Sequence, residues 1–151
     1  MPASFSLTTE TTAPPQALFD LALDVGAHVA SMGSSGEEAV GGVTSGRMRP
    51  GEEVTWRARH LGVRWTMTSR VELAGWDEPR TFTDRQVRGP FRSFVHVHTF
   101  IPTASGTRMI DDVTLASPVL GAVAERLVLV PYLRRLLRRR GAHLAAAAER
   151  A

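Results

Sequence analysis

The chain has 151 residues, of which 43% are hydrophobic and 22% charged, a composition typical of one folded domain with a sizeable core. It has no cysteine, which excludes disulfides, thiolate metal sites and cysteine nucleophiles. All eighteen basic residues are arginine and the net charge is only +3, so the arginine content does not indicate a nucleic-acid partner and none is expected.

The N-terminus and the apolar runs bear on localisation. The first twelve residues contain no basic segment followed by an apolar run, as a secretory signal would. No stretch approaches the length of about 20 apolar residues that spans a bilayer. We therefore expect a cytoplasmic protein without stable membrane insertion, in which residues 1–151 form a single domain.

The first third of the sequence predicts one strand and two helices. Residues 4–11 alternate apolar and hydroxyl side chains, which is typical of a strand. Pro14 and Pro15 then open a helix with an apolar stripe, which we expect to end at Gly26. A short second helix around residues 27–32 and a loop rich in glycine and serine follow.

From residue 39 the pattern changes to six strands and then to one long helix. The strand candidates, separated by turn signals, are residues 39–48, 53–60, 63–73, 81–88, 91–101 and 107–116. After Pro118 apolar residues recur at helical spacing, and Pro131 should kink or break this helix because it lacks a backbone donor. The order favours an α+β fold, in which a curved antiparallel sheet of about seven strands wraps around the C-terminal helix.

Two neighbouring strands within residues 82–100 carry the strongest functional signal. On each strand, the side chains that share a face combine large aromatic groups with polar ones. These side chains are Phe82, Asp84, Gln86, Phe94, His96, His98 and Phe100. Aromatic side chains of a sheet normally turn inward, and buried polar groups need partners. A sheet lined in this way is better suited to surround a pocket than a dry core.

Short loops fix the pairing of these strands. If the intervening segments are tight loops, His98 lies opposite Asp111 and Asp84 lies opposite His96, so each histidine faces a carboxylate. Three uses of such pairs stay open: general acid–base chemistry, hydrogen bonds to the polar end of a ligand, or a purely structural role. A metal ion on the His-x-His pair is a weaker fourth use because the pairs satisfy one another, so we expect no metal and no cofactor.

The order of elements resembles the helix-grip fold of the START-related superfamily, also called SRPBCC or the polyketide cyclase/dehydrase-like group. Residues 79–91, PRTFTDRQVRGPF, are similar to a bacterial branch in which such a run leads to a Trp-x-His-x-His-x-Phe strand. Phe94 stands where that branch usually has tryptophan. Residues 106–113 and 132–136 are similar to its last strand and its terminal helix, so the resemblance covers essentially the whole chain.

This resemblance implies a pocket between the sheet and the long helix for a hydrophobic or aromatic small molecule, lipid-like or polyketide-like. We expect the oxygen end of the ligand to meet Asp84, Gln86, His96, His98 and Asp111. The expected apolar wall consists of Trp65, Met67, Phe82, Phe94, Phe100, Leu127 and Val130. The alternative is an enzyme of the aromatase/cyclase or dehydrase type, with His96, His98 and Asp111 as the candidate catalytic residues.

The C-terminal helix carries a run of arginines among leucines, a pattern typical of an amphipathic helix with a solvated basic face. The arginines are Arg134, Arg135, Arg138, Arg139 and Arg140. A further alternative is therefore a non-catalytic interaction module, in which the first four of them make weak contact with an anionic membrane or a protein partner.

Histidines outside the two central strands carry no signal of their own. His60, beside the Leu61-Gly62 turn, is expected to be exposed. His28 and His143 lie in helical settings with nothing close in sequence to act on.

Overall fold

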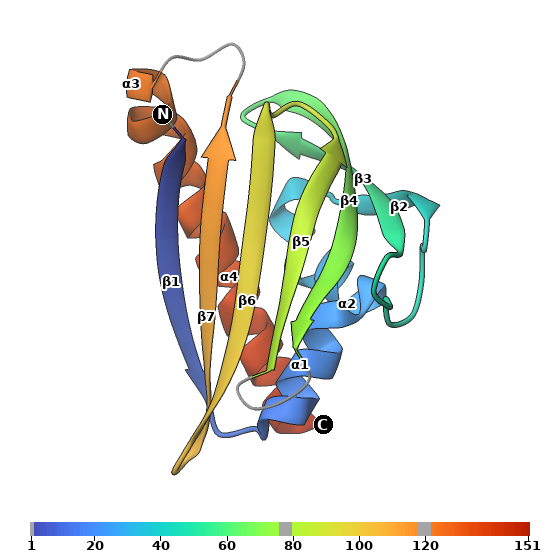
Figure 1. The fold of residues 1–151 in the computed structure, drawn as a ribbon, viewed down its shortest axis with the longest axis vertical. Helices are drawn as coiled ribbons and strands as arrows, with labels where there is room; N and C mark the ends of the chain where they lie inside the picture. The colour runs from blue at the N-terminus through green and yellow to red at the C-terminus, as the bar shows by residue number, and fades with distance from the viewer. Residues whose placement is uncertain (1, 76–79, 118–121) are drawn as a thin grey trace.

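The computed structural model describes residues 2–75, 80–117 and 122–151. Within them, seven antiparallel strands form one sheet in the order β1-β7-β6-β5-β4-β3-β2 (Figure 1). The strands are β1 (Ala3–Thr11), β2 (Glu38–Gly42), β3 (Glu53–His60), β4 (Val63–Gly75), β5 (Arg80–Arg88), β6 (Ser93–Thr103) and β7 (Gly106–Ala116). The predicted α+β fold with a seven-stranded antiparallel sheet is confirmed.

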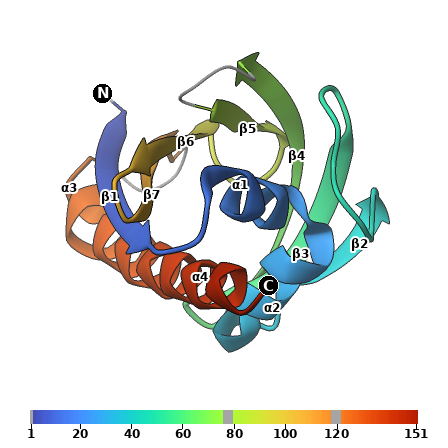
Figure 2. The same ribbon diagram turned by 90° about the horizontal axis from the view of Figure 1, so that it is seen from below.

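Two short helices follow β1 and lie on the open side of the curved sheet (Figure 2). They are α1 (Pro15–Leu23) and α2 (Val25–Ser31), and a 3₁₀ turn, η1 (Gly33–Ser35), comes next. Asp24 separates the two helices, because its backbone is extended and its carboxylate accepts a hydrogen bond from the Ala27 N–H at 2.8 Å. The first helix therefore ends at Leu23, whereas the sequence predicted that it ends at Gly26.

The C-terminal helix runs on through Pro131 but changes its geometry just before it. Helix α3 (Ala122–Ala124) leads into a π-helical turn, η2 (Glu125–Leu129), which is followed by α4 (Val130–Arg150). Pro131 lies in the first turn of α4 and has no N–H to donate to the preceding turn, so the α-helical bonding pattern is interrupted there. The predicted kink or break takes the form of this local change of helix type.

Helix α4 lies along the concave side of the sheet, where it contacts β1, α1 and α2 (Figure 2). The leucines of its inner face, Leu133, Leu136, Leu137 and Leu144, are buried. Each buried leucine side chain contributes about 1.5–3 kcal/mol, so this face holds the helix on the sheet. None of the helices in the described ranges is long and apolar enough to cross a membrane.

Strand β2 is shorter than the strand that the sequence predicts at residues 39–48. It ends at Gly42, which has a φ of 67°. A Cβ atom at Gly42 would lie 2.2 Å from the carbonyl oxygen of Glu53. Only glycine fits this left-handed, crowded position, and it turns the chain out of the sheet.

Two residues of the C-terminal helix contradict the sequence analysis. Arg140, expected on the solvated basic face, is only 2% exposed because it lies four residues before Leu144 on the buried stripe. Leu127, expected in the wall of the pocket, is 72% exposed. The π turn shifts the phase of the helix, so Leu129 is buried in place of Leu127.

Helix α4 and β1 approach each other closely at Gly141, where a Cβ atom would lie 2.5 Å from Thr9 Oγ1. Alanine in a helix is normally more stable than glycine by about 1 kcal/mol, but crowding a packed contact costs about 1–3 kcal/mol. We therefore expect Gly141→Ala to lower the free energy of unfolding by about 1 kcal/mol in urea denaturation. In a Thr9→Ala background the same change should be neutral or stabilising. Stabilisation in both backgrounds would contradict the close approach.

Candidate ligand-binding site

A cavity of about 130 Å³ lies between the sheet and helices α1, α2 and α4. Its wall is mostly apolar and includes Val71 and Phe82 from the sheet and Leu133 from α4. Two polar side chains of the central strands, Asp84 and His96, also lie on this wall. A mostly apolar cavity with few polar groups is the usual form of a small-molecule site.

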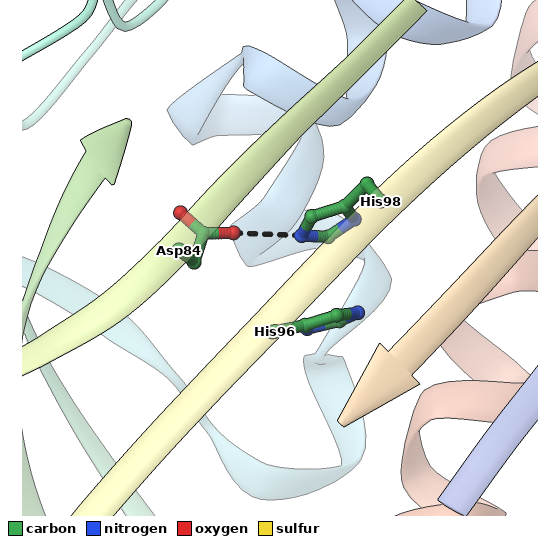
Figure 3. A group of neighbouring side chains, drawn as sticks. All are labelled: Asp84, His96 and His98. Carbon is green, nitrogen blue, oxygen red and sulfur yellow. Dashed lines mark hydrogen bonds and ion pairs between the residues drawn. The ribbon is translucent and has the colours of Figure 1, made fainter. Parts of the chain in front are cut away.

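These two groups belong to a cluster of two histidines and two aspartates on β5, β6 and β7, of which His98 and Asp111 lie behind the wall. Its strand register is the predicted one, since Asp84 pairs with His96 and His98 pairs with Asp111. The hydrogen bonds, however, run diagonally: His98 Nε2 lies 2.8 Å from Asp84 Oδ2, and His96 Nε2 lies 2.8 Å from Asp111 Oδ1. Figure 3 shows the first of these bonds and the ring of His96 beside that of His98.

Ring stacking sets the orientation of both imidazoles. The rings of His96 and His98 are nearly parallel, with centroids 3.8 Å apart. On the other side of His98 the ring of Phe82 stacks at 4.1 Å. The three rings form a column in the interior, so neither histidine can turn without disturbing its neighbours.

His98 faces a carboxylate at each of its nitrogens. Besides the bond to Asp84, its Nδ1 lies 3.2 Å from Asp111 Oδ1, a charge contact rather than a well-directed hydrogen bond. Burial disfavours the charged ring, but the carboxylates of Asp111 and Asp84 outweigh burial and raise the pKa of His98. This environment favours the imidazolium form of His98, with a proton on both nitrogens.

Arg140 supplies the second positive charge of the cluster. Its Nη1 lies 3.5 Å from Asp111 Oδ1, and both side chains are almost fully buried. Burial would raise the pKa of Asp111, yet the hydrogen bond from His96, the close contact with His98 and the charge of Arg140 hold that pKa well below its usual value. The pKa of Asp84 is also lowered, because the bond to His98 and the nearby positive charges outweigh burial.

His96 differs from His98 because the charges are already balanced without it. Two carboxylates face one imidazolium and one guanidinium, so a proton on His96 would leave a net positive charge in the interior. Burial and the charge of His98 accordingly lower the pKa of His96 to about 4, against the opposing effect of Asp111. Neutral His96 donates from Nε2 to Asp111, and no described residue bonds its Nδ1, which is left as an acceptor.

The structure brings some of the predicted site residues to the cavity and leaves others outside it. Those on its wall are Trp65, Met67, Phe82, Asp84, Phe94 and His96. His98 and Asp111 lie behind the wall, and Phe100 packs on Phe19 and Phe82 in the core.

Three further predicted residues have other contacts. Gln86 holds the turn before β6, since its amide donates to the Phe91 carbonyl at 2.8 Å and accepts from the Phe91 N–H at 3.2 Å. Val130 packs against the apolar core beneath α4. Leu127 lies on the surface.

Two polar pairs on the cavity wall were missed by the sequence analysis. His28 forms an ion pair with Glu37, and its ring lies over Trp56 at 4.4 Å. His60 Nδ1 lies 2.8 Å from the hydroxyl of Tyr132, and burial lowers the pKa of His60. The prediction that His60 is exposed is wrong, because a partner 72 residues away covers it and leaves no local sequence signal.

The geometry of the cluster does not favour a metal ion. Asp84, His96 and His98 offer ligand atoms within 4.8 Å of one another. However, the lone pairs of two stacked rings lie in nearly parallel planes, so they do not converge on one ion. His98 would also have to give up a proton that two carboxylates stabilise.

The titration of His96 predicts how stability depends on pH. The unfolded chain binds a proton at His96 near pH 6.5, whereas the folded protein binds it only near pH 4, so this group destabilises the fold as pH falls through that window. The slope reaches at most about 1.4 kcal/mol per pH unit. His98 acts in the opposite sense: its contribution is complete below pH 6.5 and is lost as pH rises through its raised folded pKa.

We therefore expect stability to be greatest near pH 6.5, and His96→Gln to reduce the loss between pH 6.5 and 4. Glutamine keeps a donor for Asp111 but does not titrate. Urea unfolding at a series of pH values measures this, and an unchanged acid slope in the variant would rule out His96 as its source.

Solved structures with the same fold cover nearly the entire chain. The KanY protein has a TM-score of 0.78 at 18% identity, with 99% of each chain covered. The Zhui aromatase/cyclase from Streptomyces sp. R1128 has a TM-score of 0.73 at 16% identity, covering 99% of this chain and 94% of that one. The protein TTHA0849 from Thermus thermophilus has a TM-score of 0.71 at 20% identity, and the match covers 97% of this chain and 99% of that one. These likenesses confirm the helix-grip fold.

No curated protein sequence matches the chain closely enough to count as a relative. The profile of one family, described as polyketide cyclase/dehydrase and lipid transport, matches residues 2–149. That match covers nearly all of the sequence and agrees with the resemblance seen in its strand motifs. The chain belongs to the polyketide cyclase/dehydrase and lipid transport family.

Proposed function

We propose that this protein binds a small aromatic molecule bearing a hydrogen-bond donor, such as a hydroxyl group, in the cavity between the sheet and α4. The observation that carries the proposal is the position of His96 and Asp84, two neighbouring acceptors on the sheet side of a mostly apolar wall. Family membership supports a hydrophobic ligand, and the named residues supply its polar end.

The polar end of the ligand follows from the protonation states. Asp84 is ionised because its pKa is lowered, and His96 is neutral with its only N–H on Asp111. Both groups therefore present acceptors at neutral pH. A ligand hydroxyl satisfies such an acceptor, whereas a carbonyl oxygen would leave it without a donor.

The apolar part of the ligand is set by aromatic side chains and by size. The rings of Trp65, Phe91 and Phe94 form a contiguous wall, with centroids 5.4 Å and 5.1 Å apart. A volume of about 130 Å³ is close to that of an engineered cavity known to take benzene. The cavity thus suits at least one aromatic ring.

Acid–base catalysis by the cluster has less support. With a pKa of about 4, His96 is protonated in only about one molecule in a thousand at pH 7, so its acid form is scarce and its neutral form is a weak base. His98 lies between two carboxylates that raise its pKa, so it holds its proton more tightly than a free imidazole, and it is absent from the cavity wall. We therefore favour ligand binding over the aromatase/cyclase or dehydrase alternative.

The interaction module also has less support than the cavity. Of the five arginines in the run 134–140, Arg140 is buried in the cluster, and Arg134 lies over the ring of Phe5 at 5.8 Å. The other three, Arg135, Arg138 and Arg139, are exposed, and the sequence pattern alone connects them to a membrane or protein partner.

Partly filling the cavity should weaken binding. Ala22 of α1 lines the cavity, so Ala22→Leu should weaken the binding of toluene and phenol by about tenfold, followed as amide shifts in NMR titrations. Ala142→Leu, on the exposed side of α4, is the matched control and should leave both affinities unchanged. Equal effects of the two substitutions, or no binding by the wild type, would refute the cavity as the site.

The donor preference is tested by phenol and toluene, which differ by a hydroxyl in place of a methyl group. We expect the wild type to prefer phenol by about fivefold, the value of one net hydrogen bond. His96→Phe should remove the preference. His96→Gln, which keeps an acceptor and a donor, should retain it. A preference that survives in His96→Phe would show that His96 is not the acceptor.

A further inference from the structure

A second, polar groove lies beside the cavity at the tip of the β3–β4 hairpin. Its wall includes three arginines, Arg57, Arg59 and Arg64, with the turn residues Leu61 and Gly62. Residues at the N-terminal end of β2 and in the 3₁₀ turn η1 form its other side. The groove therefore gathers positive charge from two adjacent strands.

Two of these arginines lack an acidic partner. Arg57 is paired with Glu38 at 3.1 Å. Arg59 and Arg64 pair directly opposite each other on β3 and β4, and no acid among the described residues lies within ion-pair distance of either. Like charges directly opposite each other on neighbouring strands destabilise a sheet. An oxyanion bound between the two guanidinium groups would relieve this repulsion.

The backbone beside Arg59 supports the same conclusion. Strand β2 pairs with β3 from Val54 to Arg57, so among the described strands none covers the edge of β3 beyond that point. An open strand edge presents backbone N–H groups. These groups lie next to the paired arginines and add neutral donors to the positive charge of the groove.

The groove and the cavity share part of their walls. Ala58 and Tyr132 line both the groove and the cavity. The hydroxyl of Tyr132 is hydrogen-bonded to His60, which also lines the cavity. The His60–Tyr132 pair therefore stands at the boundary between the apolar cavity and the arginines. Arg59 and Arg64 alternate with the cavity-lining residues of their strands and so project from the opposite face of the sheet. A ligand whose ring fills the cavity would reach them by passing the His60–Tyr132 pair and the edge of β3 that β2 leaves open.

We propose that the ligand of the cavity carries an anionic oxygen group, of the carboxylate type, bound outside the cavity in this groove, between Arg59 and Arg64. The inference rests on the proposed function, since it requires the apolar part of the same ligand to occupy the cavity. The site then recognises an amphipathic aromatic acid by three features: acceptors at the inner wall, apolar rings along the cavity and two arginines in the neighbouring groove.

The test compares phenylbutyrate with phenylbutanol, which share a ring and a chain but differ in charge. Their affinities are measured by NMR titration at low ionic strength for the wild type and for Arg59→Gln/Arg64→Gln. The control is Arg138→Gln/Arg139→Gln, which removes the same charge from exposed positions on α4. We expect the groove variant to bind phenylbutyrate about fivefold more weakly and phenylbutanol unchanged, and the control variant to bind both like the wild type.

Each other outcome overturns a defined part of the argument. If phenylbutanol binds the wild type but phenylbutyrate is weakened no more by the groove variant than by the control, the anion site is refuted and the cavity stands. If the groove variant binds both compounds equally weakly, the substitutions disturb the hairpin rather than a contact with the carboxylate, and the anion site is likewise refuted. If neither compound binds the wild type, the proposed function fails and the anion site fails with it.

Discussion

The balance of charges buried at the centre of the molecule is the constraint on which the rest of the structure depends. Two carboxylates, Asp84 and Asp111, face the imidazolium of His98 and the guanidinium of Arg140. An uncompensated charge in the interior costs several kcal/mol, so the four groups are stable there only together. They come from three adjacent strands and from α4. The balance is therefore met only when the strands are in register and the helix lies at one position along the sheet.

The same balance gives His96 its different character. It shares a strand and a ring stack with His98, yet it is neutral because the cluster has no negative charge left for it. A neutral imidazole places a hydrogen-bond acceptor on the cavity wall without the hydration that a full charge would hold there. The buried charges thus allow the wall to remain apolar, and the proposed preference for a ligand with a hydroxyl group follows from them.

The sequence predicts the sheet and its register well, because both rest on local signals. Side chains alternate at period two, and the loops beside β6 are short, so His98 has to lie opposite Asp111. The diagonal hydrogen bonds depend on how the rings stack, which the strand pattern does not contain. Arg140 escaped prediction because an arginine among arginines and leucines is indistinguishable from a solvated one. Leu127 was misplaced because a π turn changes the helix phase without a sequence signal of its own.

The two halves of the proposed site differ in how strongly the fold constrains them. The inner wall is part of the charge cluster, so a change at Asp84 alters the stability of the whole sheet. Arg59 and Arg64 lie on an exposed hairpin and have no described acidic partner, so replacing them removes a repulsion and leaves the core intact. An anion bound between the two arginines, as proposed above, would offset that repulsion without any change in the core.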